Sequence, residues 1–319
     1  MADVKTLLLL FMFIPFWVFG APKVDPEHIM ADLAATLADI KPVKMGAVYE
    51  NEIKGQDPDD FGIVVTHVNG TTYAVGTVEV GLPIMSISKV FAYAVAIEQN
   101  GLEFIVRQVG QDATGRPFDD LETYRFNPYV NTGAIAVHSY IDDISSVLDL
   151  YSNLAGSPVR LNEEWRAVPM PITTATAWLV KSKGRLAGVP SEATTAYLEA
   201  CIAEVTLLQL ARMGAVLAND GVDLETDERF LESGTVRQAL SISVTAGMYE
   251  DSGAWFAETG LPSKSGVSGA VLAVVPGWGA IAAYSPRLDE AGNSVRGTLA
   301  IKSLARKWGL HSMERLLND

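Results

Sequence analysis

The segments patterned as strands lie toward the two ends of this 319-residue chain, and the long stretch between them is patterned for helices. Asn69-Gly70 separates residues 61–68 from residues 71–76, and this dipeptide accepts the positive φ angles of a tight hairpin turn. Residues 270–275 and 281–284 flank a Pro-Gly turn near the other end. A sheet therefore has to be assembled from both ends of the chain.

Between Ser88 and Ala246 apolar residues recur at three- and four-residue steps, as on one face of a helix. This spacing predicts helices over residues 90–98, 132–138, 141–150, 174–181, 193–205 and 208–217, with others over 26–39 and after Asn293. We expect an α/β fold of the α+β type: a largely antiparallel sheet built from both chain ends and flanked by helices, with an inserted all-helical domain. The expected sheet domain comprises residues 21–85 and 247–319, and the helical domain residues 86–246.

The first twenty residues differ from the rest of the chain. Lys5 precedes an apolar run over residues 7–19, which is shorter than the ~20 residues that span a bilayer. Val18 and Gly20 occupy the −3 and −1 positions of a cleavage site before Ala21. We expect residues 1–20 to be a signal peptide, the mature protein to be secreted or periplasmic, and no stable membrane insertion after cleavage. An uncleaved leader that anchors the protein is the alternative.

Composition excludes several functions. The net charge is −14, with 24 Lys and Arg against 38 Asp and Glu, so no basic stripe is available to neutralise nucleic-acid phosphates. Cys201 is the only cysteine, which excludes an intramolecular disulfide and a cysteine-based metal site. The histidines have no metal-ligand spacing, and we expect neither a metal nor an organic cofactor; they are His28, His67, His138 and His311.

Two short motifs carry candidate chemistry. Ser86 and Lys89 form an S-x-x-K motif, and residues three apart share a face of a helix. A lysine can take the proton of a serine hydroxyl if burial keeps the amine neutral, so Ser86 is a candidate nucleophile. The run Lys264-Ser265-Gly266 precedes a strand, and the pairing of S-x-x-K with K-[ST]-G recurs in serine penicillin-recognising enzymes. There the strand edge supplies a backbone N–H to an oxyanion hole.

Longer runs resemble the serine-dependent glutaminase family, whose fold is akin to that of serine β-lactamases. Residues 85–91 are similar to the family's Q-S-I-S-K-V-F and residues 127–135 to its N-P-x-I-N-A-G-A-I. Agreement continues in order through residues 217–221, 247–249, 260–267, 285–286 and 292–295. The resemblance covers nearly all of the chain after residue 45.

The resemblance implies a role for each matching residue. Ser86 is the expected nucleophile, Lys89 its proton acceptor and Tyr249 the catalytic tyrosine that moves protons to the leaving group and from water. The main-chain N–H groups of Ser86 and Val267 are the expected oxyanion hole. Other positions hold the substrate's amino-acid end in the family, and their matches here are Tyr49, Asn131 and Tyr197, with Val267 also counted as substrate-binding. A homodimer or homotetramer is also implied.

The chain departs from the family where the substrate binds. Met85 replaces the glutamine before the nucleophile, and the alignment places Arg166 and Thr173 where the family has a Glu and an Asn. A shifted alignment would instead bring Glu163 or Glu164 to the Glu position. The leading hypothesis is hydrolysis of a small-molecule carboxamide, L-glutamine to L-glutamate and ammonia, through a Ser-Lys acyl-enzyme. The alternatives are a serine hydrolase of the same fold acting on another amide, β-lactam or ester, and a binding protein with an altered site.

Overall fold

The structure, a computed structural model, describes residues 22, 24–49, 56–115, 117, 119, 121, 126–166 and 170–317. The predicted signal peptide, residues 1–20, lies outside the described residues. In the part that is described, no helix is long and apolar enough to cross a bilayer.

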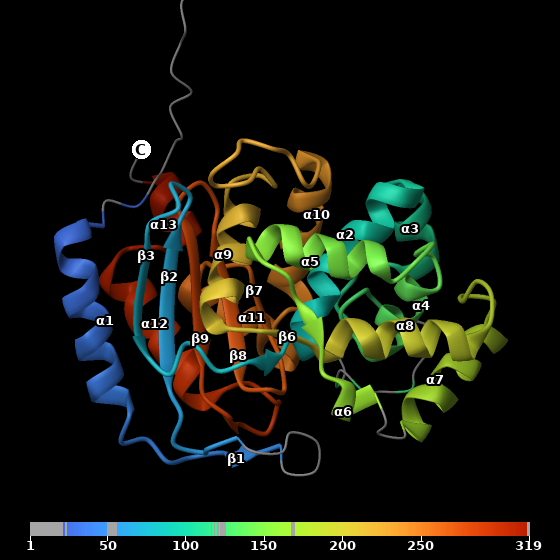
Figure 1. The fold of residues 1–319 in the computed structure, drawn as a ribbon, viewed down its shortest axis with the longest axis horizontal. Coiled ribbons are helices and arrows are strands. Elements are labelled where there is room, and N and C mark those ends of the chain that lie inside the picture. The colour runs from blue at the N-terminus through green and yellow to red at the C-terminus, as the bar shows by residue number, and fades with distance from the viewer. Residues whose placement is uncertain are drawn as a thin grey trace, which may run out of the picture.

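A five-stranded antiparallel sheet joins the two ends of the chain (Figure 1). Its order is β3-β2-β9-β8-β7, with bounds β2 Gly62–His67, β3 Thr72–Gly76, β7 Ser263–Ser265, β8 Ala270–Val275 and β9 Gly279–Tyr284. β2 pairs with β9 along its whole length, from Gly62 opposite Tyr284 to His67 opposite Gly279. The predicted hairpin at Asn69-Gly70 is confirmed, with Gly70 at a φ of 84°.

Helices cover both faces of this sheet because its inner strands are apolar on both sides. On one face Ile63 and Val65 pack with α1 (Pro26–Ile40) and α12 (Val295–Lys307). On the other face Val64 joins a second core that includes α9 (Leu207–Ala218). The predicted α+β class, with an antiparallel sheet flanked by helices, is confirmed.

Most of the remaining helices lie on the side of α9 that faces away from the sheet (Figure 1). Their bounds are η1 Met85–Ile87, α2 Ser88–Asn100, α3 Leu102–Val109, α4 Asn131–His138, α5 Ser145–Ala155, α6 Glu163–Arg166, α7 Pro171–Ser182, α8 Pro190–Ile202, α10 Ser233–Ala246, η2 Tyr249–Asp251, α11 Ser252–Thr259 and α13 Ser312–Leu317. Short strands β1 (Ala47–Val48) and β10 (Arg287–Leu288) pair with each other, and β4 (Leu82–Pro83), β6 (Ala203–Val205) and β5 (Arg160–Leu161) form a small sheet in that order. The predicted domain boundaries at residues 85 and 247 stay a prediction.

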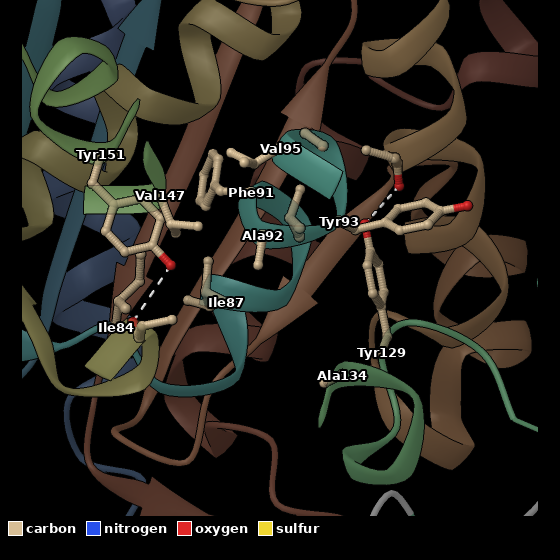
Figure 2. Close-up of a cluster of buried hydrophobic side chains, with 14 of the residues drawn as sticks. Ile84, Ile87, Phe91, Ala92, Tyr93, Val95, Tyr129, Ala134, Val147 and Tyr151 are labelled. Atoms are coloured by element: carbon tan, nitrogen blue, oxygen red, sulfur yellow. Dashed lines mark hydrogen bonds between the residues drawn. The ribbon is translucent and has the colours of Figure 1, made fainter. Parts of the chain in front are cut away.

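Helix α2 lies at the centre of the helical part (Figure 2). Phe91 meets the edge of Tyr151 with ring centroids 5.7 Å apart, and Tyr93 meets Tyr129 in the same way at 6.3 Å. Every residue of α2 from Ser88 to Ile97 is buried. This packing holds the N-terminus of α2, and therefore the S-x-x-K motif, in one place.

Two predicted helices have different ends in the structure. The helix predicted over residues 193–205 ends at Ile202, because residues 203–205 are extended and hydrogen-bond to strands on both sides. The helix predicted over residues 141–150 is shifted to α5, which begins at Ser145, and the Asp143 carboxylate accepts the Ser145 N–H in the turn before it.

A fully buried arginine ties the N-terminal segment to α12. Arg296 Nε donates to the Val43 carbonyl at 2.7 Å, and its terminal nitrogens donate to the Asp59 carbonyl at 3.3 Å and the Asp59 carboxylate at 3.4 Å. A buried guanidinium without such acceptors would be strongly destabilising. The cluster fixes both ends of the segment that carries Tyr49.

The close approach of α10 to β7 gives a stability prediction. A Cβ on Gly247 would lie 1.8 Å from the Ser263 carbonyl oxygen and 2.5 Å from that of Ser243, so Gly247→Ala must displace backbone. We expect it to lower the free energy of unfolding by at least about 2 kcal/mol, measured by denaturant titration. Gly253→Ala on α11 is the control, because nothing lies within 4 Å of its new methyl. Equal effects of the two changes would contradict the packing described here.

Candidate active site

Ser86 lies in a short 3₁₀ turn that leads directly into α2. The turn comprises Met85–Ile87, and Ser86 is buried. Met85 has a φ of 47°, a left-handed conformation that is unfavourable for a side chain of this kind. Such strain is retained where the surrounding packing requires it, and here it fixes the backbone immediately before the predicted nucleophile.

Lys89 is buried one turn further on, and its amine has two acceptors. Nζ lies 3.1 Å from the Tyr129 carbonyl oxygen and 2.7 Å from Asn131 Oδ1. Burial lowers the pKa of Lys89 to about 8, more than two pH units below its ordinary value. A neutral amine has two N–H bonds and one lone pair. The two acceptors can take both hydrogens, which leaves the lone pair available to a proton donor.

Tyr249 approaches the same site from η2, after α10. Its backbone also adopts a left-handed conformation, with a φ of 55°. The hydroxyl donates to the Ser265 carbonyl at 3.1 Å. Burial raises the pKa of Tyr249, and hydrogen bonding to the Ser86 side chain and to Ser265 opposes that rise. The phenol therefore remains protonated at neutral pH and is a hydrogen-bonding neighbour of the predicted nucleophile.

The end of β7 lies against the turn that carries Ser86. A Cβ on Gly266 would lie 3.2 Å from the Ile84 carbonyl oxygen and 3.6 Å from the Met85 Cβ. Gly269 N–H closes a tight turn by donating to the Gly266 carbonyl at 2.9 Å. Val267 follows Gly266 within this turn, and its role as an oxyanion donor stays a prediction.

Two of the three residues predicted to bind the substrate's amino-acid end, Asn131 and Tyr197, lie beside the Lys89 amine. Tyr197 OH donates to Asn131 Oδ1 at 3.1 Å, and its ring lies 5.9 Å from Lys89 Nζ. Burial raises the pKa of Tyr197 well above its ordinary value, and charge on Tyr249 or Tyr49 would raise it further. Tyr49 is the most accessible of the three tyrosines, at 37% exposure.

Arg166, which one alignment places at the family's Glu position, is paired with two carboxylates. Arg166 donates to Glu163 at 3.0 Å and to Glu199 at 2.9 Å. The side chain of Glu163 is 68% exposed, and Arg166 binds it at the surface. Thr173 lies half-buried in the first turn of α7. The side chain of Glu164 lies outside the described residues.

Sequence reasoning assigned no role to two buried groups at this site. Lys264 Nζ lies 4.3 Å from the centre of the Tyr249 ring and donates to the Gly247 and Ser265 carbonyls at 3.0 and 2.6 Å. Burial and the charge of Lys89 lower its pKa well below the ordinary value. Cys201 Sγ lies 3.6 Å from Ser88 Oγ, behind the motif. The K-S-G motif was the available signal for Lys264, whereas nothing in the sequence indicated the position of Cys201.

Among the described residues, no group of three His, Cys, Asp or Glu side chains is arranged to hold a metal ion. The expectation of a reaction without metal or organic cofactor stays a prediction.

Comparisons with known proteins agree with this architecture. The family model described as Glutaminase matches residues 45–313. A glutaminase of Trichormus variabilis is 34% identical over 311 residues, which cover 92% of this chain and 93% of that protein. The solved structure of the probable glutaminase ybaS has a TM-score of 0.85 at 32% identity, covering 90% of this chain and 98% of that one. The structure of Mglu in its tris and glutamate form has a TM-score of 0.84 at 34% identity, covering 90% and 68%.

The chain belongs to the glutaminase family. The predicted resemblance to serine-dependent glutaminases is thereby confirmed. The prediction that the protein is a hydrolase is confirmed as well. The roles of individual site residues are not tested by these comparisons and stay predictions.

The low pKa of Lys89 gives a pH prediction. Lys89 must be uncharged to accept a proton, so kcat/KM should fall about tenfold per pH unit below pH 8 and level off above it. The raised pKa of Tyr249 means that this phenol should add no falling limb below about pH 10. Asn131→Asp puts a carboxylate at the position 2.7 Å from Nζ, which should move the acid limb upward by at least about one pH unit.

Tyr197→Phe is the matched control for this shift. It removes a hydrogen bond to Asn131 without adding charge, so it should lower kcat/KM and leave the position of the limb unchanged. An acid limb that stays in place in Asn131→Asp would show that Lys89 is not the titrating base.

Proposed function

We propose that this chain hydrolyses the side-chain carboxamide of L-glutamine to L-glutamate and ammonia through a covalent serine intermediate. The observation that supports this most directly is the buried Lys89 amine, which has a lowered pKa and both of its hydrogens accepted, one helical turn from Ser86. Membership of the glutaminase family supports L-glutamine as the amide that is hydrolysed.

In the proposed first half-reaction, Lys89 Nζ takes the proton of Ser86, and Ser86 Oγ forms a bond to the carboxamide carbon. The developing negative charge on the carboxamide oxygen is held by the main-chain N–H groups of Ser86 and Val267. Tyr249 OH gives a proton to the leaving nitrogen, the C–N bond breaks and ammonia departs. Lys89 then returns its proton to the tyrosyl oxygen, which restores the phenol and the neutral amine.

In the second half-reaction a water molecule attacks the ester. Lys89 accepts the proton of the water, the bond from carbon to Ser86 Oγ breaks, and Lys89 gives that proton to Ser86 Oγ, which restores the serine hydroxyl and the neutral amine. Asn131, Tyr197 and Tyr49 are proposed to position the rest of the substrate. The balance is one amide and one water consumed, with one carboxylic acid and one ammonia formed.

Substitution of the nucleophile tests the proposal. Ser86→Ala should lower ammonia release from glutamine at least about a thousandfold, because the covalent route is lost. Ser88→Ala is the matched control, since Ser88 lies two residues away with its hydroxyl beside Cys201, and it should retain wild-type activity. A diazo-ketone analogue of glutamine should alkylate Ser86 with loss of dinitrogen, adding the mass of the reagent less N2 in the wild type and not in Ser86→Ala. Full ammonia release by Ser86→Ala would contradict the covalent serine route, whereas a wild type that neither releases ammonia nor is labelled would favour a binding protein.

Export is part of the same proposal. We propose that residues 1–20 are a signal peptide that is removed before Ala21, and that the mature enzyme acts outside the cytoplasm as a homodimer or homotetramer. Intact-mass measurement of the protein recovered from its native cells should give an N-terminus at Ala21. A chain that begins at Met1 and sediments with membranes would instead identify an uncleaved anchor.

A further inference from the structure

Asn127 is a buried residue in the turn that leads into α4. Only 1% of its surface is exposed, and main-chain groups lie on both sides of its amide. Oδ1 accepts the N–H of Tyr129 at 2.9 Å and the N–H of Val130 at 3.3 Å. Nδ2 donates to the Asp112 carbonyl at 3.0 Å. Because a carbonyl faces Nδ2, the orientation of the amide is determined, and its oxygen has to face the two N–H groups.

One of these bonds determines the direction of an acceptor of Lys89. The Val130 N–H and the Tyr129 carbonyl belong to one peptide group, which is planar and trans, so they point in opposite directions. Asn127 Oδ1 binds the N–H on one side of this group. The carbonyl on the other side accepts from Lys89 Nζ at 3.1 Å. Turning the peptide group away from Asn127 would therefore also turn its carbonyl away from the amine.

The turn depends on Asn127 because the helix that follows does not fix it. Among the described contacts, α4 has no side-chain cap at Val130, the residue before its first turn. The oxygen of Asn131, the next residue, lies 2.7 Å from Lys89 Nζ instead. A Cβ on Gly133 would lie 1.8 Å from the Asn127 carbonyl oxygen, so the first turn of α4 packs directly on the main chain of Asn127.

We propose that Asn127 is a positioning residue for the reaction: by binding the Val130 N–H, it directs the Tyr129 carbonyl toward the Lys89 amine. This inference rests on the proposed function, in which Lys89 takes the proton of Ser86. An uncharged amine with both hydrogens accepted presents its lone pair in one direction. With a single acceptor the amine can turn about its terminal bond, and the lone pair is no longer directed at one proton donor.

Loss of the Tyr129 acceptor would affect the two protonation states of Lys89 unequally. A hydrogen bond from an ammonium is stronger than one from an uncharged amine, so the charged form loses more. The pKa of Lys89 should therefore fall further below its present value of about 8. Because the uncharged amine is the active form, the acid limb of kcat/KM should move to lower pH. The plateau above that limb should fall as well, because the lone pair is less well directed.

The titratable and charged groups around Lys89 come from several elements. They are Tyr129 before α4, His138 on α4, Tyr151 on α5, Tyr197 and Cys201 on α8, Tyr249 on η2, Lys264 on β7, and Asp119. Burial lowers the pKa of His138 to about 4, and it raises the pKa of each of these tyrosines and of Cys201. An uncharged substitution of Asn127 adds no charge to this set, so a shift of the acid limb would report the hydrogen bonding of Lys89.

Three single substitutions in the full chain test the inference, with ammonia release from L-glutamine measured as a function of pH. Asn127→Leu removes Oδ1, so its acid limb should lie at least about half a pH unit below that of the wild type, with a plateau at least about tenfold lower. Asn127→Ser retains an oxygen that binds such N–H groups more weakly, so its limb should lie between the other two. Asn100→Leu is the matched control. The amide of Asn100 donates to the Ala96 and Tyr140 carbonyls at the other end of α2, so its loss should leave the limb in place.

An acid limb that stays in place or moves to higher pH in Asn127→Leu would overturn the inference, as would an equal shift in Asn100→Leu. Circular dichroism and thermal unfolding show whether each variant is folded. If Asn127→Leu is not, Asn127→Ser carries the test alone. An unchanged limb in that variant then overturns the inference, and a downward shift supports it.

A measurement on the inactive Ser86→Ala chain separates the two proposals. With carbon-13 at Cε of the lysines, the NMR signal that disappears in Lys89→Met reports the protonation of Lys89 directly. Asn127→Leu in the Ser86→Ala background should lower the pKa of Lys89 by at least about half a pH unit. If it does so while the wild type releases no ammonia from glutamine, the proposed hydrolysis is wrong and the action of Asn127 on Lys89 stands. An unchanged pKa would overturn the inference whatever the activity.

Discussion

An amine surrounded by packed side chains can remain there only if it gives up its charge or finds acceptors for its hydrogens. Lys89 has acceptors in Tyr129 and Asn131, and burial lowers its pKa to about 8, so it loses its charge far more readily than an exposed lysine. The positions of the neighbouring site residues depend on the burial of this amine and on its two acceptors. Tyr197 is oriented by the same Asn131 oxygen, and α2 must be buried on all sides for the amine to be neutral.

The sheet supplies the other half of the site from the far end of the chain. Pairing of β2 with β9 unites the two termini, and β7 at the edge brings Ser265 and Val267 to the start of α2. Lys264 lies under the Tyr249 ring and reaches back to the Gly247 carbonyl, so the phenol is held between a buried amine and a main-chain acceptor. The site is therefore a junction between the edge of a sheet and the end of a helix, and neither element forms it alone.

Much of this could be predicted from local pattern. The Asn69-Gly70 turn and the periodicity of α1, α2 and α9 are strong short-range signals, and motif order was enough to indicate Ser86, Lys89 and Tyr249. Helix α10 was not predicted, because its Ser- and Thr-rich sequence has a weak apolar face and is stabilised by packing on α2. The pairing of Arg166 with Glu199, and the position of Cys201 behind Ser88, join residues far apart in sequence and leave no local pattern.

Among the described residues only four besides glycine have a positive φ, and two of them are aspartates, which tolerate it. The other two are Met85 and Tyr249, one on each side of the proposed nucleophile. A glycine at position 85 would relax the turn, so retention of a long thioether there means that its side-chain contacts outweigh the conformational penalty. Laboratory selection for heat resistance would therefore be expected to leave this methionine in place and to act elsewhere in the chain.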